Sequence, residues 1–327
     1  MSSIQIGQVM AMSIEHIIPE PEVVVASHQT TGVNWLNIAF YLVLTFGLSW
    51  TVWIVLRAIG VPLVVYAAIG MFGPALAATI VRLTRHEGFA DAGLRLVGRG
   101  VKKGGGWMYL AAYVSVPVLL ALGIVLALLT GVQHWAFADN VHQMSVAIVD
   151  AVRNQGQKLP VGMSADQLAT ISIIGQTILA FTLALLFNML FTFGEEFGWR
   201  GYLLPRLAPL GGVRAALITG IIWGLWHAPL IVLVGYNYPG HPWLGVGMMV
   251  VFSVALSLIF AWLRFRSGSV WPSTLAHAAV NGQAGFAIIF LSRADSLVAA
   301  PIGIIGLIPM LAFGIWLAAT GRLNLAQ

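Results

Sequence analysis

The sequence predicts an all-α integral membrane protein with about eight transmembrane helices, and three observations support this. Of the 327 residues, 59% are hydrophobic and 8% are charged, whereas a soluble domain carries about 25% charged residues. The mean hydropathy is +0.90. The apolar runs are about as long as the 20 residues with which a helix crosses a bilayer. One polytopic domain therefore fits the length better than two soluble domains of about 150 residues.

Eight apolar runs are predicted to form the spans. They cover residues 35–57, 62–83, 107–130, 169–193, 214–234, 243–264, 270–292 and 299–319. The acidic N-terminal residues 1–33 lack the basic start of a signal peptide. We expect them to form a cytoplasmic tail that is flexible, followed by a single transmembrane domain over residues 34–327.

Basic residues predict the orientation of these spans. The loops after the second, fourth and sixth spans and the C-terminal end hold Arg85, Arg95, Arg99, Lys102, Lys103, Arg200, Arg206, Arg264, Arg266 and Arg322. The opposite loops hold Arg57, Arg153, Lys158 and Arg293. Because cytoplasmic loops carry the excess of Lys and Arg, both termini are predicted to lie in the cytoplasm.

Two connections between spans are long. Residues 84–106 are basic and are expected to lie against anionic lipid. Residues 131–168 are expected to be external, with a helix that starts at Ser164 and has Asp166 in its first turn.

Composition also excludes some functions. The chain has no cysteine, so disulfides, a thiolate nucleophile and a cysteine metal site are excluded. The net charge of +5 is scattered over loops, so membrane lipids, and not nucleic acid, are the expected partners.

Ionisable side chains are rare in the second half of the chain. From residue 169 onward there are three acids and three histidines. Asp295 and His241 fall in predicted external loops and are expected to be solvated. The other four fall in or at the ends of spans: Glu195, Glu196, His227 and His277. Such groups cost a few kcal/mol each in lipid and tend to face a protein interior or a wet cavity, so we expect a functional site.

The stretch "FGEEFGWRGY", residues 193–202, contains both glutamates. Glu196 and Arg200 are four apart and share one helix face, so they can pair. Glu195 lies about 140° around the helix from Arg200. One glutamate is then held by the arginine while the other is left for chemistry. The alternative is that both glutamates lie at the interface and pair with Arg200 and Arg206.

The stretch "IIWGLWHAPL", residues 221–230, places His227 one turn after Trp223, and Pro229 is expected to bend or end the helix there. The alternative for His227 is a satisfied core histidine. With a span that starts at Val213, His227 would lie about 21 Å along it, deeper than His277. We therefore expect the span to start later, near Thr219.

The stretch "WPSTLAHAAVNGQ", residues 271–283, places His277 and Asn281 on one helix face. Pro272 suits a helix start. The alternative is that the pair joins two helices by hydrogen bonds.

Together these residues suffice for the attack of water on an amide. A carboxylate can take a proton from water, and a histidine can orient that water or protonate the leaving amine. A second histidine and the Asn281 amide can donate to the developing oxyanion.

The ordered motifs "EEFGWR", "WGLWH" and "HAAVN" resemble those of the type II CAAX prenyl endopeptidases, in the bacterial branch known as CPBP or ABI intramembrane proteases. The resemblance covers roughly residues 169–292. The second motif of that family usually begins with Phe, where this chain has Trp223.

The resemblance implies an eight-helix fold with a polar cavity open to the cytoplasmic side, in a prokaryotic plasma membrane. It implies that Glu195 and His227 activate water, that His277 and Asn281 stabilise the oxyanion, and that Glu196 and Arg200 form a supporting pair, with Trp223 beside them. The implied substrate is a peptide or protein, with or without a lipid modification.

A metal-free site is expected, although zinc stays open. If a metal binds, Glu195, His227 and His277 would be its ligands, with water as the fourth. The helical signature H-E-x-x-H is absent. Two other functions also stay open: a proton- or ion-coupled transporter, since Glu and His in spans relay protons, and a catalytically silent scaffold.

Overall fold

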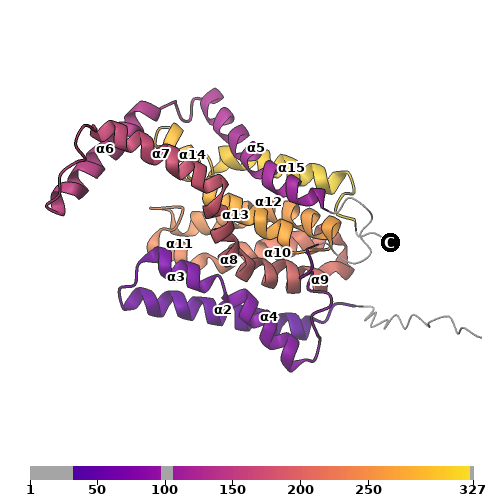
Figure 1. Ribbon diagram of the computed structural model, residues 1–327. Helices are drawn as coiled ribbons and strands as arrows, with labels where there is room; N and C mark the ends of the chain where they lie inside the picture. The colour runs from indigo at the N-terminus through magenta and orange to yellow at the C-terminus, as the bar shows by residue number, and fades with distance from the viewer. Residues whose placement is uncertain (1–31, 97–105, 325–327) are drawn as a thin grey trace, which may run out of the picture. The chain divides into compact units, whose positions relative to one another are not determined.

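The regular elements of the described residues are helices. The computed structural model describes residues 32–96 and 106–324 (Figure 1). The longer helices are α2 (Trp35–Ala58), α3 (Leu63–Gly70), α4 (Gly73–Thr84), α5 (Trp107–Leu129), α6 (Phe137–Asn154), α7 (Ala165–Phe181), α8 (Leu183–Gly198), α10 (Gly212–Trp226), α11 (Ala228–Val234), α12 (Pro242–Ser267), α13 (Trp271–Gln283) and α15 (Ile304–Ala319). Shorter turns are η1 (Trp199–Leu203), α9 (Leu204–Leu207), η2 (Ala208–Leu210) and α14 (Phe286–Phe290).

Five continuous stretches of the described residues are long and apolar enough to cross a membrane. They are Trp35–Ala58, Leu63–Thr84, Trp107–Leu129, Gly212–Val234 and Pro242–Ser267. The pair α7 and α8, bent by 51° at its junction, makes a sixth if it counts as one span. These lengths and compositions indicate a polytopic integral membrane protein.

Two of the eight predicted spans are shorter than expected. The run 270–292 divides into α13 and α14, because the helix ends around Ala284 and Gly285. The run 299–319 becomes helical only at Ile304, after a loop, so α15 has 16 residues. Apolar run length therefore overestimated both helices.

The predicted external stretch 131–168 is largely helical. It contains α6, which packs against α7. The predicted helix start is confirmed: Ser164 accepts from the Gln167 backbone N–H and the Gln167 side chain bonds back to the Ser164 N–H, a capping box. Helix α7 thus begins at Ala165, before the predicted start of the span at residue 169.

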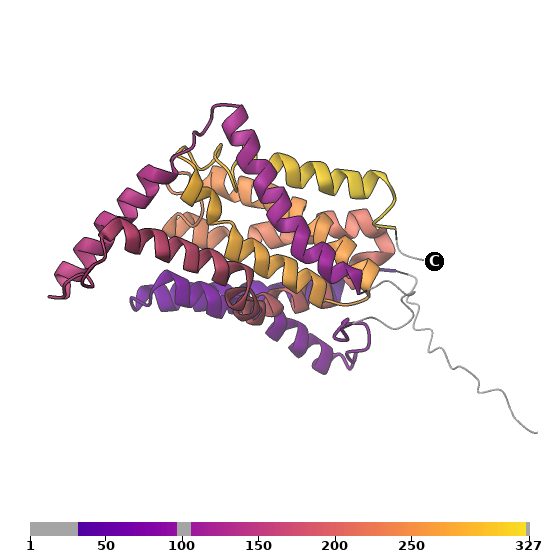
Figure 2. The ribbon, with the colours of Figure 1, turned by 45° about the horizontal axis from the view of Figure 1, so that its top comes forward.

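Helices α8, α10, α12 and α13 form the centre of the bundle. Helix α12 packs against α10, α13 and α15, while α8 packs against α13 and α4. Figures 1 and 2 show α2, α3 and α4 on one side of this centre and α5 with α15 on the other. The motif-bearing elements are therefore enclosed by other helices.

Glycines bring α10 and α12 close together. A Cβ atom on Gly220 would lie 2.7 Å from the Val254 Cα, and one on Gly224 would lie 2.5 Å from the Val250 Cα. Those neighbours are backbone atoms, which cannot move aside individually. Small residues let membrane helices approach in this way.

We expect Gly220→Ala to destabilise the protein by about 1–3 kcal/mol, the usual cost of overpacking. Thermal unfolding in detergent measures this. Gly247→Ala on α12, the helix that packs against Gly220, is the control, because a Cβ there meets nothing within 4 Å. Equal melting temperatures for the two variants would contradict the close packing.

The basic segment after α4 is attached to the bundle over its described part. Arg82 is buried and bonds the Asp91 carboxylate, the Gly88 carbonyl and the Gly201 carbonyl. Arg206 pairs with both Glu87 and Asp91. Residues 85–96 are thus tied to the bundle while most of them stay exposed, so their contact with anionic lipid stays a prediction. Arg99, Lys102, Lys103 and the tail 1–31 lie outside the described residues.

Asp91 is expected to make the stability depend on pH. Burial opposes its ionisation, but the hydrogen bond and charge of Arg82, together with Arg206, hold the pKa of Asp91 below its usual value. Its contribution is therefore complete above the unfolded pKa of about 3.9 and is lost as the pH falls through the lower folded pKa.

The comparison is between wild type and Asp91→Asn, by thermal unfolding in detergent from neutral to acidic pH. We expect the wild type to be more stable at neutral pH and the difference to shrink in acid. A difference that is constant with pH would contradict the role given to the carboxylate charge.

Candidate active site

Both glutamates of the EEFGWR motif are buried, and they have different partners. Glu195 Oε2 accepts hydrogen bonds from the indole N–H of Trp223 at 2.6 Å and of Trp199 at 3.4 Å. Glu195 is 2% exposed and Glu196 is 0% exposed. Arg206 pairs with Glu87 and Asp91 instead, so the alternative in which the two glutamates pair with Arg200 and Arg206 is wrong.

Glu196 joins two other site residues. Its Oε1 accepts from Arg200 Nη1 at 2.9 Å and lies 2.9 Å from His277 Nδ1. The contact with Arg200 is the one that the spacing of four residues predicts. The contact with His277 comes from packing of α8 against α13, so Glu196 holds a histidine as well as an arginine.

The helix changes its winding directly after the glutamates. Residues 199–203 form a π-helical turn, in which the Leu204 N–H bonds the Trp199 carbonyl. Such turns are rare and occur often at functional sites. Here the turn contains both Trp199 and Arg200, whose side chains contact the two glutamates.

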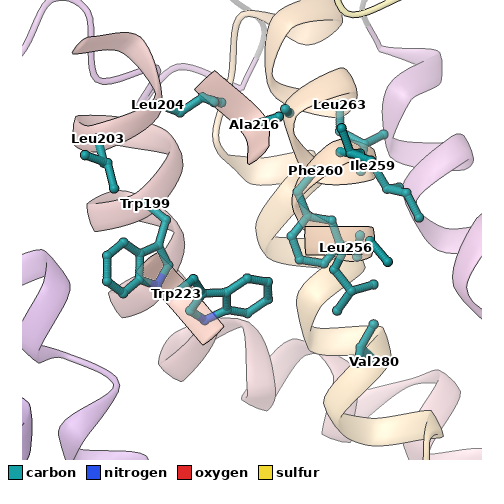
Figure 3. Close-up of a cluster of buried hydrophobic side chains, with 14 of the residues drawn as sticks. Trp199, Leu203, Leu204, Ala216, Trp223, Leu256, Ile259, Phe260, Leu263 and Val280 are labelled. Atoms are coloured by element: carbon teal, nitrogen blue, oxygen red, sulfur yellow. The ribbon is translucent and has the colours of Figure 1, made fainter. Parts of the chain in front are cut away.

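Trp223 contacts several residues of the site. Its indole N–H bonds Glu195. Its ring centroid lies 5.1 Å from that of His277 and 6.0 Å from that of His227. The guanidinium carbon of Arg200 lies 4.7 Å from the same ring, a cation–π contact. Figure 3 shows the indoles of Trp199 and Trp223 next to each other.

The span that carries His227 starts earlier than expected. Helix α10 begins at Gly212, so the start near Thr219 is wrong. The predicted break is confirmed, because α10 ends at Trp226 and α11 restarts with Pro229 in its first turn. Helical side chains lean toward the N-terminus of their helix. The side chain of Trp223, one turn before His227, therefore leans back toward the start of the helix, where it contacts His277.

Three of the four predicted catalytic residues line one cavity of about 270 Å³, which we call the site cavity. His227, His277 and Asn281 line it together with Trp223. Glu195 is not a lining residue, and it bonds the Trp223 indole, which is one. Asn281 is exposed to this cavity, one turn after the buried His277.

The hydrogen bonds of the two histidines define which ring nitrogen carries a proton. His227 Nδ1 lies 3.0 Å from the Trp223 carbonyl, and a carbonyl only accepts, so Nδ1 is the donor and Nε2 has the lone pair. His277 Nδ1 likewise faces the Glu196 carboxylate. In both rings Nε2 remains for other partners.

His241 and Asp295, the two loop residues that were expected to be solvated, contact each other. His241 Nε2 lies 2.9 Å from Asp295 Oδ2, and both side chains are partly exposed. The Leu297 N–H and His241 lower the pKa of Asp295. This pair ties the turn after α11 to the segment before α15.

The candidate zinc ligands are not arranged around one point. Over residues 32–96 and 106–324, no three His, Cys, Asp or Glu side chains are placed to hold a metal ion. In this arrangement Glu195, His227 and His277 are not gathered closely enough to hold a zinc ion together.

Sequence reasoning missed Trp199 and Phe260. Trp199 is four residues after Glu195, a spacing that could have pointed to the contact. Phe260 stacks near His277, with centroids 5.8 Å apart, and lies under Arg200. It belongs to α12, an apolar helix in which nothing in the sequence distinguishes it.

Comparison with known proteins identifies the class to which these motifs belong. Residues 175–283 match the profile of the Rce1-like type II CAAX prenyl endopeptidases. This stretch includes every predicted site residue from Glu195 to Asn281. The chain therefore carries a domain of that family of proteases, and the predicted resemblance is confirmed.

A particular relative gives the same result. Over 93 residues the chain is 30% identical to CAAX prenyl protease 2 of Methanococcus maripaludis. The match covers 27% of this chain and 34% of the relative. The chain thus spans about a third of the length of the curated relative that it matches.

Proposed function

We propose that this protein is an intramembrane endopeptidase that hydrolyses a peptide bond with water activated by Glu195 and His227. The observation that supports this most is the site cavity. A buried carboxylate, two imidazoles and an amide meet around Trp223, although they come from three separate helices.

Glu195 takes a proton from water in this proposal. Because Glu195 does not line the site cavity, this water has to reach it past the Trp223 indole. Both indole bonds go to Oε2, so Oε1 is the oxygen that receives the proton. The lone pair on His227 Nε2 orients the water. As the water oxygen bonds to the carbonyl carbon, one proton passes to Glu195. When the carbon–nitrogen bond breaks, Glu195 returns that proton to the leaving amine.

His277 and Asn281 stabilise the charge on the carbonyl oxygen. The buried site contains two carboxylates and the cation of Arg200, so an imidazolium at His277 makes its total charge zero. Its Nε2–H and the Asn281 amide then donate to the oxyanion. Glu196 is a positioning residue, since it bonds Nδ1 of His277 while Arg200 keeps its charge balanced.

The substrate is a peptide or protein segment, with or without a prenylated cysteine. The name of the relative, CAAX prenyl protease 2, supports the reaction class. We also propose that α13 with α14, and α15, complete an eight-helix transmembrane domain, because α15 packs on α5 and α12 and α13 on α5 and α8.

Peptide profiling by mass spectrometry tests the proposed function. Membranes that contain wild-type protein should accumulate cleaved products that are missing with His227→Ala or His277→Ala. His241→Ala, whose ring lies at the Asp295 loop contact, is the matched control and should leave the products. Identical product sets in all four membranes would contradict a peptidase at this site.

A further inference from the structure

The π-helical turn after the two glutamates leaves two of its carbonyl groups short of helical donors. The Leu204 N–H bonds the Trp199 carbonyl, five residues back. The next residue, Pro205, has no N–H. The Arg200 carbonyl therefore lacks a donor five residues on, and the Gly201 carbonyl lacks its regular donor four residues on. Because the whole turn is buried, these carbonyls need donors from elsewhere in the protein.

Two arginines from other helices supply these donors. Arg264, in the last turn of α12, donates from Nε to the Arg200 carbonyl at 3.1 Å. Arg82, in the last turn of α4, donates from Nη2 to the Gly201 carbonyl at 2.7 Å. Both bonds are buried. The turn is thus held by side chains that are 64 and 119 residues away in the chain.

Asp91, in the loop after α4, holds both arginines. Its carboxylate accepts from Arg82 Nη1 at 2.6 Å, and its backbone carbonyl accepts from Arg264 Nη2 at 2.8 Å. Gly93 lets the loop approach: its φ is +71°, and a Cβ atom there would lie 2.8 Å from the Arg264 guanidinium carbon. We call Arg82, Arg264 and Asp91 the arginine clamp. It lies where the predicted basic loops meet, which we call the basic end of the bundle.

The turn that the arginine clamp holds carries the partners of both glutamates. The Trp199 indole N–H bonds Glu195, and Arg200 donates to Glu196 at 2.9 Å. Because the winding of a helix sets the directions of its side chains, a change in the turn would move both partners. Glu196 also bonds the His277 ring. A continuous series of contacts therefore joins the loop after α4 to the proposed catalytic groups.

From these contacts we propose that the arginine clamp positions Glu195 and Glu196 for peptide hydrolysis by fixing the π-helical turn. Its members do not line the site cavity, so they are positioning residues and not catalytic ones. Asp91 and Arg82 precede the stretch 175–283 that matches the protease family. Two of the three members thus come from outside that domain. This inference rests on the proposed peptidase function.

Arg264→Lys and Arg82→Lys test the clamp, because the single nitrogen of lysine keeps the charge but cannot span the partners of a guanidinium. The matched control is Arg266→Lys. Arg266 is exposed in the same last turn of α12 and donates its Nε to the Arg322 carbonyl at 3.2 Å. Hydrogen–deuterium exchange by mass spectrometry follows the backbone amides of residues 199–204. Steady-state cleavage of a profiled peptide gives kcat and KM.

We expect both clamp variants to exchange these amides about 10-fold faster than wild type and to lose about 10-fold in kcat, with KM unchanged. Arg266→Lys should match wild type in both measurements. In a Glu196→Gln background, Arg264→Lys should lower kcat by no more than about threefold, because part of its effect passes through Glu196. Arg264→Lys alone decides if Arg82→Lys does not fold.

The proposal is overturned if the turn exchanges at the wild-type rate in the clamp variants, or if kcat stays within twofold of wild type. It is also overturned if Arg264→Lys lowers kcat equally in the two backgrounds, as a general loss of folded protein would. Exchange needs no peptidase activity. An inactive wild type would therefore refute the proposed function, while the exchange rates would still decide whether the arginines hold the turn.

Discussion

Glu195→Gln is expected to lower kcat for peptide cleavage by about 10³-fold, within the range for loss of a general base, while the protein stays folded. The glutamine oxygen can still accept from the Trp223 indole, which bonds Glu195 at 2.6 Å, so packing around the site is preserved. What is lost is the ability to take a proton from water. KM should change little, because Glu195 does not line the cavity.

The matched control for this variant is Glu87→Gln, which removes a carboxylate at the basic end, paired with Arg206. That change should leave kcat unaltered. Steady-state cleavage of a peptide found in the membrane profiling gives kcat and KM for each protein. The comparison is made between proteins whose melting temperatures are equal. A kcat for Glu195→Gln within twofold of wild type would remove Glu195 from the chemistry.

Glu196→Ala is expected to cost about 3–5 kcal/mol of unfolding free energy, the usual loss when one partner of a buried ion pair is removed. Arg200 and Glu196 are both fully buried and bonded at 2.9 Å. The substitution leaves the guanidinium and the His277 ring without their carboxylate. Denaturant unfolding in mild detergent measures the loss.

The conservative Glu196→Gln variant separates positioning from stability. Its amide oxygen can still accept a bond but carries no charge to balance an imidazolium at His277. We expect this variant to fold and to lose about 10²-fold in kcat with little change in KM. If Glu196→Gln unfolds less easily than the alanine variant but cleaves at the wild-type rate, Glu196 is a purely structural residue.

Local contacts in the site could be predicted from the sequence, whereas contacts between helices could not. The Glu196–Arg200 bond follows from a spacing of four residues on one helix. The bond from Glu196 to His277 joins residues 81 apart in the chain, and only packing of α8 on α13 creates it. For the same reason, Trp223 was recognised as a neighbour of His227 but not as the donor to Glu195.

Helix boundaries were less predictable where proline and glycine cluster. Pro205 and Pro209 do not delay the fifth span, because each lies in the first turn of a short helix, where the missing N–H costs little. The chain turns at Gly211, with φ of 94°, and α10 starts at once. The apolar pattern of residues 270–292 likewise hid the break after α13.

Incorporation of oxygen from isotopically heavy water is the most direct test of whether the protein hydrolyses a peptide bond. It examines the central claim, that Glu195, His227, His277 and Asn281 form a hydrolytic site. Purified wild-type protein should yield products whose new C-terminal carboxylate carries a single heavy oxygen atom, and Glu195→Gln should yield none. If the Glu195→Gln protein forms the same labelled products at the same rate, or if purified wild type forms none from any profiled peptide, the hydrolytic account is wrong.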